Sequence, residues 1–264
     1  MKKQAMLFVI AVQFLTRLPV PRLEGFQTSW LSDSARYFPA VGVLVGALCI
    51  TVWWLGSLVF APPVAIGLMM GASLLLTGAF HEDGFADVCD GFGGGRTRDR
   101  VLLIMKDSRI GAYGAIGIAM MLGLKWCCLV ALPFQALPVI VVAAHMTSRW
   151  SATALIWRLR NQRADDDSKS KPFADALSGP NWFLSGAIGA LVFSPALLLI
   201  APSSYGRTLP SLLAALLASL LTTLTAAMYF QRRIGGYTGD CLGAVQQLAE
   251  LAFMLGALGT LGTR

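Results

Sequence analysis

The chain has 264 residues, of which 56% are hydrophobic and 13% are charged, and its formal net charge is +7. A soluble domain usually carries about 25% charged residues, so this composition excludes an ordinary soluble enzyme and indicates a protein embedded in a bilayer. Five cysteines without a Cys-x-x-Cys pair argue against both a disulfide framework and a zinc site.

The chain begins with "MKKQAMLFVIAVQFLTRLPVPR", which has the basic end and apolar middle of a signal peptide. It lacks a small-residue cleavage site, and Arg17 and Arg22 follow the apolar stretch closely. We therefore expect a retained segment that spans briefly, re-enters the membrane or lies in its interface.

Seven longer apolar segments follow, and several reach the roughly 20 residues that a spanning helix needs. They are residues 37–60, 61–80, 112–132, 134–157, 182–202, 207–230 and 247–263. Short proline-marked turns, such as "APP" at 61–63, separate the members of a pair. We predict an all-α polytopic bundle of about seven transmembrane helices, with residues 1–264 forming one integral membrane domain.

Three polar loops interrupt the bundle, at residues 81–111, 158–181 and 231–246. Together with the N-terminal region they hold 17 of the 21 lysines and arginines. Cytoplasmic segments of membrane proteins are enriched in these residues, so we expect the N-terminus and all three loops on the cytoplasmic side of the inner membrane. This bias accounts for most of the positive charge, and no nucleic-acid partner is expected.

The first polar loop opens with "HEDGFADVCDGFGGG", which contains the four carboxylates Glu82, Asp83, Asp87 and Asp90. The spacing of the three aspartates is i, i+4, i+7, which places them on one face of a helix that the following glycines would end. Carboxylates on one stripe repel each other unless cations neutralise them. Hard ions such as Mg²⁺ prefer oxygen ligands, so the four carboxylates are predicted metal ligands. The alternative is an acidic face solvated in the cytoplasm.

The segment "MKDSRIGAYGA" follows in the same loop. Lys106 and Arg109 are predicted phosphate clamps, and Asp107 is a further candidate for the metal shell. A helix is expected to begin after Gly111, and free N–H groups at its N-terminus would favour a phosphate. Arg98, which lies beyond the glycine run, is interpreted as a topology charge.

Three ionisable residues lie inside apolar segments: Lys125, His145 and Arg149. Charges at membrane depth are costly and usually face the bundle interior. For Arg149 the alternative is snorkelling toward the cytoplasmic surface. The pattern predicts no role for Lys125. In the third loop, "GYTGDCLGA" surrounds Tyr237 and Asp240 with glycine, which is typical of a substrate contact or a further metal ligand.

Five blocks resemble the adenosylcobinamide-GDP ribazoletransferase family, also called cobalamin (5′-phosphate) synthases. They are "FLTRLPVP", "ARYFPAVGVLVG", "GAFHEDGFADVCDGFGGG", "MKDSRIGAYG" and "GYTGDCLGA", in this order along most of the chain. The resemblance implies a Mg²⁺-dependent membrane enzyme in a late step of cobalamin biosynthesis. Such an enzyme transfers adenosylcobinamide phosphate from adenosylcobinamide-GDP to α-ribazole or α-ribazole 5′-phosphate, giving adenosylcobalamin or its 5′-phosphate and GMP.

The roles implied by this resemblance follow the motifs. We expect in-line attack by the ribazole 3′-hydroxyl on the phosphorus bound to cobinamide. The predicted catalytic residues are Asp83, Asp87 and Asp107. The predicted substrate contacts are His81, Lys106, Arg109, Tyr237 and Asp240. The predicted metal ligands are Glu82, Asp83, Asp87 and Asp90. Which carboxylate is a ligand and which is a base stays open, as does the oligomeric state.

Two alternatives remain. The sequence from Asp87 to Gly91 has the DxxDG opening of CDP-alcohol phosphotransferases, but no Ala-Arg follows it and no pair of aspartates four apart appears downstream. A cation-coupled transporter would place its carboxylates at mid-membrane on broken helices, whereas these carboxylates lie at the end of an apolar segment.

Overall fold

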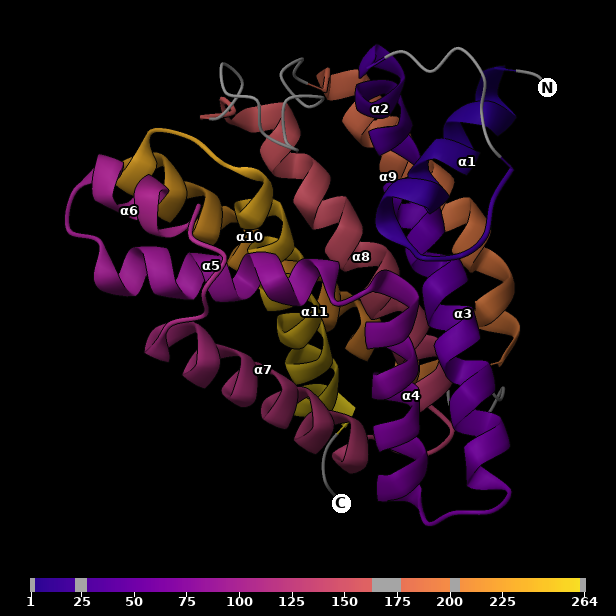
Figure 1. The fold of residues 1–264 in the computed structure, drawn as a ribbon. Coiled ribbons are helices and arrows are strands. Elements are labelled where there is room, and N and C mark those ends of the chain that lie inside the picture. The colour runs from indigo at the N-terminus through magenta and orange to yellow at the C-terminus, as the bar shows by residue number, and fades with distance from the viewer. Residues whose placement is uncertain (1–2, 22–27, 163–176, 200–204, 262–264) are drawn as a thin grey trace.

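The computed structural model describes residues 3–21, 28–162, 177–199 and 205–261. Within these ranges the chain is helical and has no strand, only an isolated bridge between Asn161 and Tyr237. Figure 1 shows long helices running alongside one another, with α1 and the end of α11 at opposite ends of the bundle. The predicted all-α architecture is confirmed.

Among the described residues, seven helices run along the bundle. They are α3 (Phe38–Ser57), α4 (Pro62–Thr77), α7 (Ala112–Ala131), α8 (Leu137–Arg158), α9 (Gly179–Phe193), α10 (Tyr205–Ile234) and α11 (Gly239–Leu261). Among the described residues six segments are long and apolar enough to cross a membrane, and a seventh is added if α4 and the helix after it are counted as one bent span. The protein is therefore a multi-pass membrane protein, in agreement with the predicted number of about seven spans.

A sharp bend separates α4 from α5 (Phe80–Gly94), whose axes differ by 87°. Gly78 and Ala79 both have positive φ, and their backbone N–H groups close the α4 end on the Leu74 carbonyl. A Cβ at Gly78 would collide with the guanidinium of Arg17, so glycine is required there for space as well as for conformation. The bend turns the acidic segment across the end of the bundle, as Figure 1 shows.

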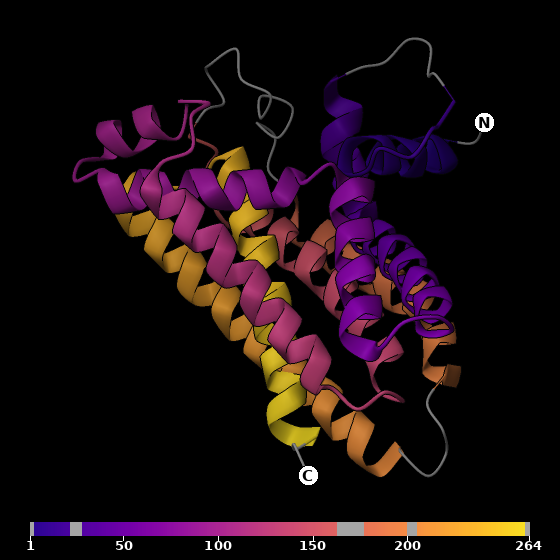
Figure 2. The same cartoon turned by 60° about the horizontal axis from the view of Figure 1, so that its bottom comes forward.

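The N-terminal segment forms α1 (Lys3–Leu15), which is too short to cross a bilayer alone. Figure 2 shows α1 lying across the end of the bundle, beside α2 (Thr28–Ser34). One side of α1 is buried through Leu7, Ile10 and Leu15. Of the three predicted arrangements, this geometry favours a helix in the membrane interface.

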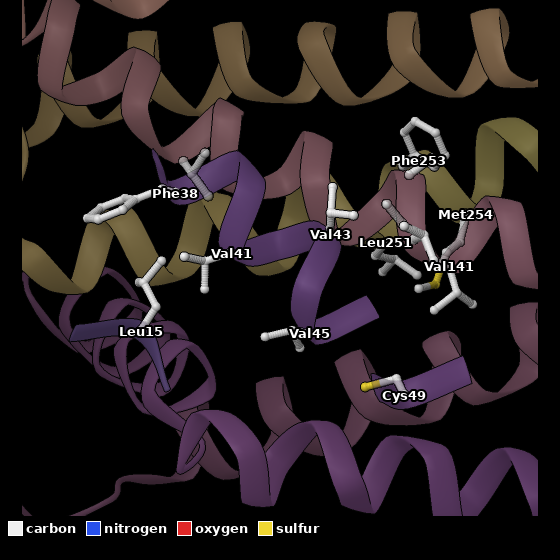
Figure 3. Packing of buried hydrophobic residues seen from close by; sticks show 14 of the residues in the cluster. Leu15, Phe38, Val41, Val43, Val45, Cys49, Val141, Leu251, Phe253 and Met254 are labelled. Carbon is white, nitrogen blue, oxygen red and sulfur yellow. The ribbon is translucent and has the colours of Figure 1, made fainter. Parts of the chain in front are cut away.

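Helices α8 and α11 occupy the centre of the bundle. In the most apolar stretch of each helix, 83% of the α8 residues and 72% of the α11 residues are buried inside the protein. The corresponding share is 28% or less in α7, α9 and α10. Figure 3 shows Val43 of α3, Val141 of α8 and Leu251 of α11 among the buried hydrophobic residues of this interior. Polar residues on α8 and α11 are consequently surrounded by protein rather than by lipid.

The polar loops contain more helix than predicted. The first holds α5 and α6 (Arg98–Ile104), and the third narrows to residues 235–238 because α10 and α11 extend into the predicted range. The helices continue because their backbone groups are still satisfied within each helix, whatever the polarity of the side chains. Most of the second loop, including its three successive aspartates, lies outside the described residues.

Candidate active site

The acidic segment forms the predicted helix, α5, which ends at Gly94 within the predicted glycine run. Gly84 lies against α11, where an added Cβ would come within 3.0 Å of the Asp240 Cα and carbonyl oxygen. Gly243 of α11 makes the matching close approach to the His81 carbonyl oxygen. The two glycines therefore let α5 and α11 pack backbone to backbone, which brings the start of α11 to the acidic helix.

The carboxylates of α5 point in three directions. Asp83 is exposed, Asp87 is half-buried one turn later, and Asp90 is buried. Glu82 is turned toward the bundle interior, where its Oε1 accepts a hydrogen bond of 2.9 Å from Gln247 Nε2. Asp83 and Asp87 thus form an acidic pair on the outer face of α5, and Glu82 is directed away from it.

Asp90 holds the start of α7. Its Oδ2 accepts from the Gly111 backbone N–H at 2.7 Å, and its Oδ1 accepts from the Gly114 N–H at 2.8 Å. The positive end of the α7 dipole also stabilises a carboxylate placed there. Asp90 therefore uses two of the N–H groups that were predicted to favour a substrate phosphate, and the phosphate contact itself stays a prediction. The metal-ligand role of Asp90 stays a prediction.

Asp107 and Arg109 form a surface ion pair between α6 and α7. Arg109 Nη2 lies 2.7 Å from Asp107 Oδ2, and its Nε and backbone N–H both donate to Asp107 Oδ1 at 3.0 Å. The Arg109 guanidinium lowers the pKa of the Asp107 carboxyl to about 2, and Asp107 in turn raises the pKa of Arg109. A carboxylate with so low a pKa is a weak proton acceptor at neutral pH.

The described ends of the three polar loops meet at one place. The Nε of Arg98 donates to the Ile234 carbonyl oxygen at 3.1 Å, and its Nη2 donates to Gln162 Oε1 at 2.8 Å. The Gln162 backbone N–H donates to the Tyr237 carbonyl at 2.8 Å, and the Tyr237 N–H donates to the Arg160 carbonyl at 3.0 Å. Loops that were predicted on one side of the membrane therefore contact each other directly.

This junction changes the interpretation of two residues. Arg98 is more than a topology charge, because its guanidinium ties the first loop to the other two. Tyr237 is 1% exposed, and burial raises the pKa of its phenol. The structure places Tyr237 in the loop junction. The predicted substrate contacts at Tyr237, Asp240 and Lys106 stay predictions.

A second polar cluster lies beneath α5, inside the bundle. Lys125 of α7 forms a salt bridge with Glu250 of α11, with 2.8 Å between Nζ and Oε1, and donates to Gln247 Oε1 at 2.6 Å. The other oxygen of Glu250 accepts from Gln246 Nε2 at 2.6 Å and from Ser148 Oγ at 3.4 Å. Lys125, for which no role was predicted, is therefore the partner of a buried carboxylate.

Arg149 also points into this cluster. Its Nη1 donates to the His145 carbonyl at 3.1 Å and lies 3.2 Å from His145 Nδ1. The residue is only 2% exposed, so the snorkelling alternative is wrong and the interior interpretation is confirmed. Glu250 was not predicted as a functional residue. The sequence offered one signal for this residue: Glu250 is an isolated acid in one apolar segment, and Lys125 is an isolated lysine in another.

The donor set for a metal is small. Among the described residues no group of three or more His, Cys, Asp or Glu side chains is arranged to hold a metal ion. Mg²⁺ commonly binds through only one or two carboxylates together with substrate phosphates. The outer-face pair Asp83 and Asp87 fits that mode, because it is accessible and its members are one helical turn apart.

The fold and site together define a multi-pass membrane protein whose acidic helix lies across the loop-bearing end of its bundle. The family model described as cobalamin-5-phosphate synthase matches residues 7–258. The chain therefore belongs to the cobalamin-5-phosphate synthase family.

Curated relatives match over nearly their whole length. A protein of Leptothrix cholodnii is 43% identical over 97% of this chain and 96% of its own. A protein of Shewanella frigidimarina is 41% identical over 96% of this chain and 94% of its own. A protein of Ralstonia pickettii is 45% identical over 94% of this chain and 93% of its own. All three are named adenosylcobinamide-GDP ribazoletransferase. No solved structure matches the chain.

Proposed function

We propose that this protein is an adenosylcobinamide-GDP ribazoletransferase. It joins the adenosylcobinamide phosphate of adenosylcobinamide-GDP to α-ribazole or α-ribazole 5′-phosphate, with release of GMP. The observation that carries the proposal is the family match over residues 7–258, together with relatives of that name more than 40% identical over nearly the full chain. Neither the CDP-alcohol phosphotransferase nor the transporter alternative has a comparable observation in its favour.

The chemistry is a phosphoryl transfer. The ribazole 3′-hydroxyl attacks the phosphorus attached to cobinamide, the bond from that phosphorus to the bridging oxygen of the diphosphate breaks, and GMP leaves. Bound Mg²⁺ would offset the negative charge that develops on the diphosphate. One of Asp83 and Asp87 would hold it from the outer face of α5 while the other stays available as a base, and Lys106 and Arg109 would orient the diphosphate.

The hydroxyl proton needs an acceptor. Asp107 is a poor one in this structure, because Arg109 keeps its pKa at about 2. Asp83 is exposed and Asp87 is half-buried on the outer face, and these two carboxylates are the better candidates. We assign proton acceptance to Asp83 or Asp87, and we assign Asp107 the task of fixing the Arg109 guanidinium.

We place the site on the cytoplasmic side of the inner membrane. The support is the concentration of lysine and arginine in the loop-bearing end, where the described loops meet. Single cysteines at positions 97 and 59, in a cysteine-free background, test this orientation. An impermeant thiol reagent added to intact cells should label position 59 only. Labelling of position 97 would contradict it.

The function is tested by incubating the purified protein in lipid nanodiscs with adenosylcobinamide-GDP, α-ribazole 5′-phosphate and Mg²⁺. We expect a corrinoid product with the mass of adenosylcobalamin 5′-phosphate and an equal amount of GMP. Formation of GMP without the corrinoid product would indicate hydrolysis, and absence of both would refute the proposal.

A further inference from the structure

A pocket lies inside the bundle beside the start of α5, which contributes His81 and Glu82 to its lining. It is lined by α3, α4, α5, α7, α8 and α11. Its walls are largely apolar, with Met69 and Leu74 on α4, Leu122 and Leu129 on α7, and Met254 on α11. The buried ion pair of Lys125 and Glu250 and the side chains of His81, Glu82, His145 and Arg149 supply its polar lining.

Two polar atoms in this pocket have no partner. Glu82 Oε2 and Arg149 Nε are both buried and make no hydrogen bond within the described chain. The other carboxylate oxygens of the cluster are paired: each Glu250 oxygen accepts at least one hydrogen bond, and Glu82 Oε1 accepts from Gln247. An unmet acceptor and an unmet donor in one pocket are costly unless a ligand or water satisfies them.

The lining of the pocket is partly exposed on some helices and buried on others. Its partly exposed lining residues include Met70 and Ser73 on α4 and Leu122 on α7, whereas the residues that α8 and α11 contribute are buried. Leu75 of α4 and Met120 of α7 are exposed on the adjoining lipid-facing surfaces. The partly exposed part of the lining therefore lies on α4, on α7 and, at Glu82, on α5.

The chemistry of the lining limits what can bind. Two cations, Lys125 and Arg149, face two carboxylates, Glu82 and Glu250, so the pocket has no excess positive charge for a diphosphate. A ligand with an apolar body fits the walls. At its polar end it would need an acceptor for Arg149 Nε and a hydroxyl or N–H donor for Glu82 Oε2.

We propose that this pocket binds the nucleoside substrate, α-ribazole, with its apolar base between α4 and α7 and its polar atoms at Glu82 and Arg149. The inference rests on the proposed function. A heteroaromatic base supplies the apolar body and the acceptor, and a ribose supplies the hydroxyl. Glu82 and Asp83 are adjacent on α5 and their side chains leave the helix about 100° apart, so a ribose hydroxyl bound at Glu82 would lie beside a diphosphate bound at Asp83.

Filling the pocket without touching its charges is the most direct test. Leu122→Trp places a large side chain in the wall, and Met120→Trp, on the same helix but 57% exposed to lipid, is the matched control. We expect Leu122→Trp to weaken α-ribazole binding about tenfold or more, a loss of about 1.4 kcal/mol, by calorimetry in nanodiscs without the second substrate. The KM for adenosylcobinamide-GDP should change less than about twofold. Met120→Trp should change neither quantity.

Arg149→Lys provides an independent variant, because it keeps the charge and removes the Nε donor. It should raise the KM for α-ribazole without raising the KM for adenosylcobinamide-GDP. Unchanged α-ribazole affinity in Leu122→Trp would overturn the inference, and so would equal losses for both substrates.

A membrane lipid with a hydroxylated headgroup offers the same chemistry as the nucleoside. Native mass spectrometry distinguishes the two: loss of a retained phospholipid in Leu122→Trp, with α-ribazole affinity intact, would make this a lipid site and refute the proposal. Wild-type protein that binds α-ribazole in the pocket but forms no corrinoid product would contradict only the proposed function. Turnover with α-ribazole affinity unaffected by Leu122→Trp would contradict only the pocket assignment.

Discussion

Removing one partner of the buried Lys125–Glu250 pair should destabilise the protein strongly. Each side chain is 6% exposed, and Nζ lies 2.8 Å from Oε1. Glu250→Gln removes the carboxylate paired with the lysine and leaves two buried cations, Lys125 and Arg149, with Glu82 as the one carboxylate still in the pocket lining. An unpaired buried charge costs about 3–5 kcal/mol in soluble proteins, and a charged residue at the centre of a membrane helix costs about 2.5–3.5 kcal/mol, so we expect about 3 kcal/mol.

Thermal unfolding in nanodiscs measures this loss. For a chain of this size about 3 kcal/mol corresponds to a fall in Tm of about 6–12 °C. Lys125→Met should give a similar fall, and the double variant should recover about 2 kcal/mol relative to the sum of the two, because neither charge is then left alone. Cys127→Ser, an exposed neighbour on α7, should stay within about 2 °C of wild type. Single variants with unchanged Tm, or strictly additive losses, would refute the reasoning.

Three further outcomes are expected from the contacts of the loop-bearing end. Asp90→Ala should lower stability by about 1–2 kcal/mol, measured as Tm, because two α7 N–H groups lose their acceptor. Arg98→Gln should lower Tm, because it loosens the loop junction. Arg109→Lys should leave Tm unchanged and should lower kcat/KM by a factor that corresponds to about 2–4 kcal/mol of lost transition-state stabilisation. Equal effects on Tm would contradict the distinction. Asp107 should stay ionised at every pH above about 4, since its folded pKa is about 2. Any stabilisation that its ionised form gives the protein is present above the ordinary pKa of 3.8 and is lost only as the pH falls through about 2. An inflection of kcat/KM near pH 6 that disappears in Asp107→Asn would show that this assignment is wrong.

The fold was predictable because its main determinants are local. Runs of apolar residues specify helices that satisfy their own backbone groups, and the bias of lysine and arginine predicted which loops lie together. The convergence of Arg98, Gln162 and Tyr237 agrees with that grouping. The extent of each helix was less predictable, since α11 begins at Gly239, well before its apolar segment.

The residues of the candidate site were predictable from the sequence, but the contacts that their side chains make were less so. Periodicity placed Asp83, Asp87 and Asp90 on one stripe, but it could not show that the start of α7 meets that stripe at Asp90. The partner of Lys125 was hidden for a similar reason, because Glu250 is 125 residues away in the chain. Contacts between distant helices depend on packing angles and on close approaches such as that of Gly84, which no single segment encodes.

The outer face of α5 is the centre of the proposed chemistry, and one comparison tests it most directly. GMP release is measured for Asp83→Asn and for Asp99→Asn, which removes an equally charged side chain that is 90% exposed on nearby α6. With Tm unchanged in both, Asp83→Asn should lose at least about 100-fold in rate, because charge stabilisation in phosphoryl transfer contributes several kcal/mol, and Asp99→Asn should stay near wild type. Wild-type GMP release by Asp83→Asn at limiting Mg²⁺, or equal losses in the two variants, would contradict the assignment of catalysis to this face.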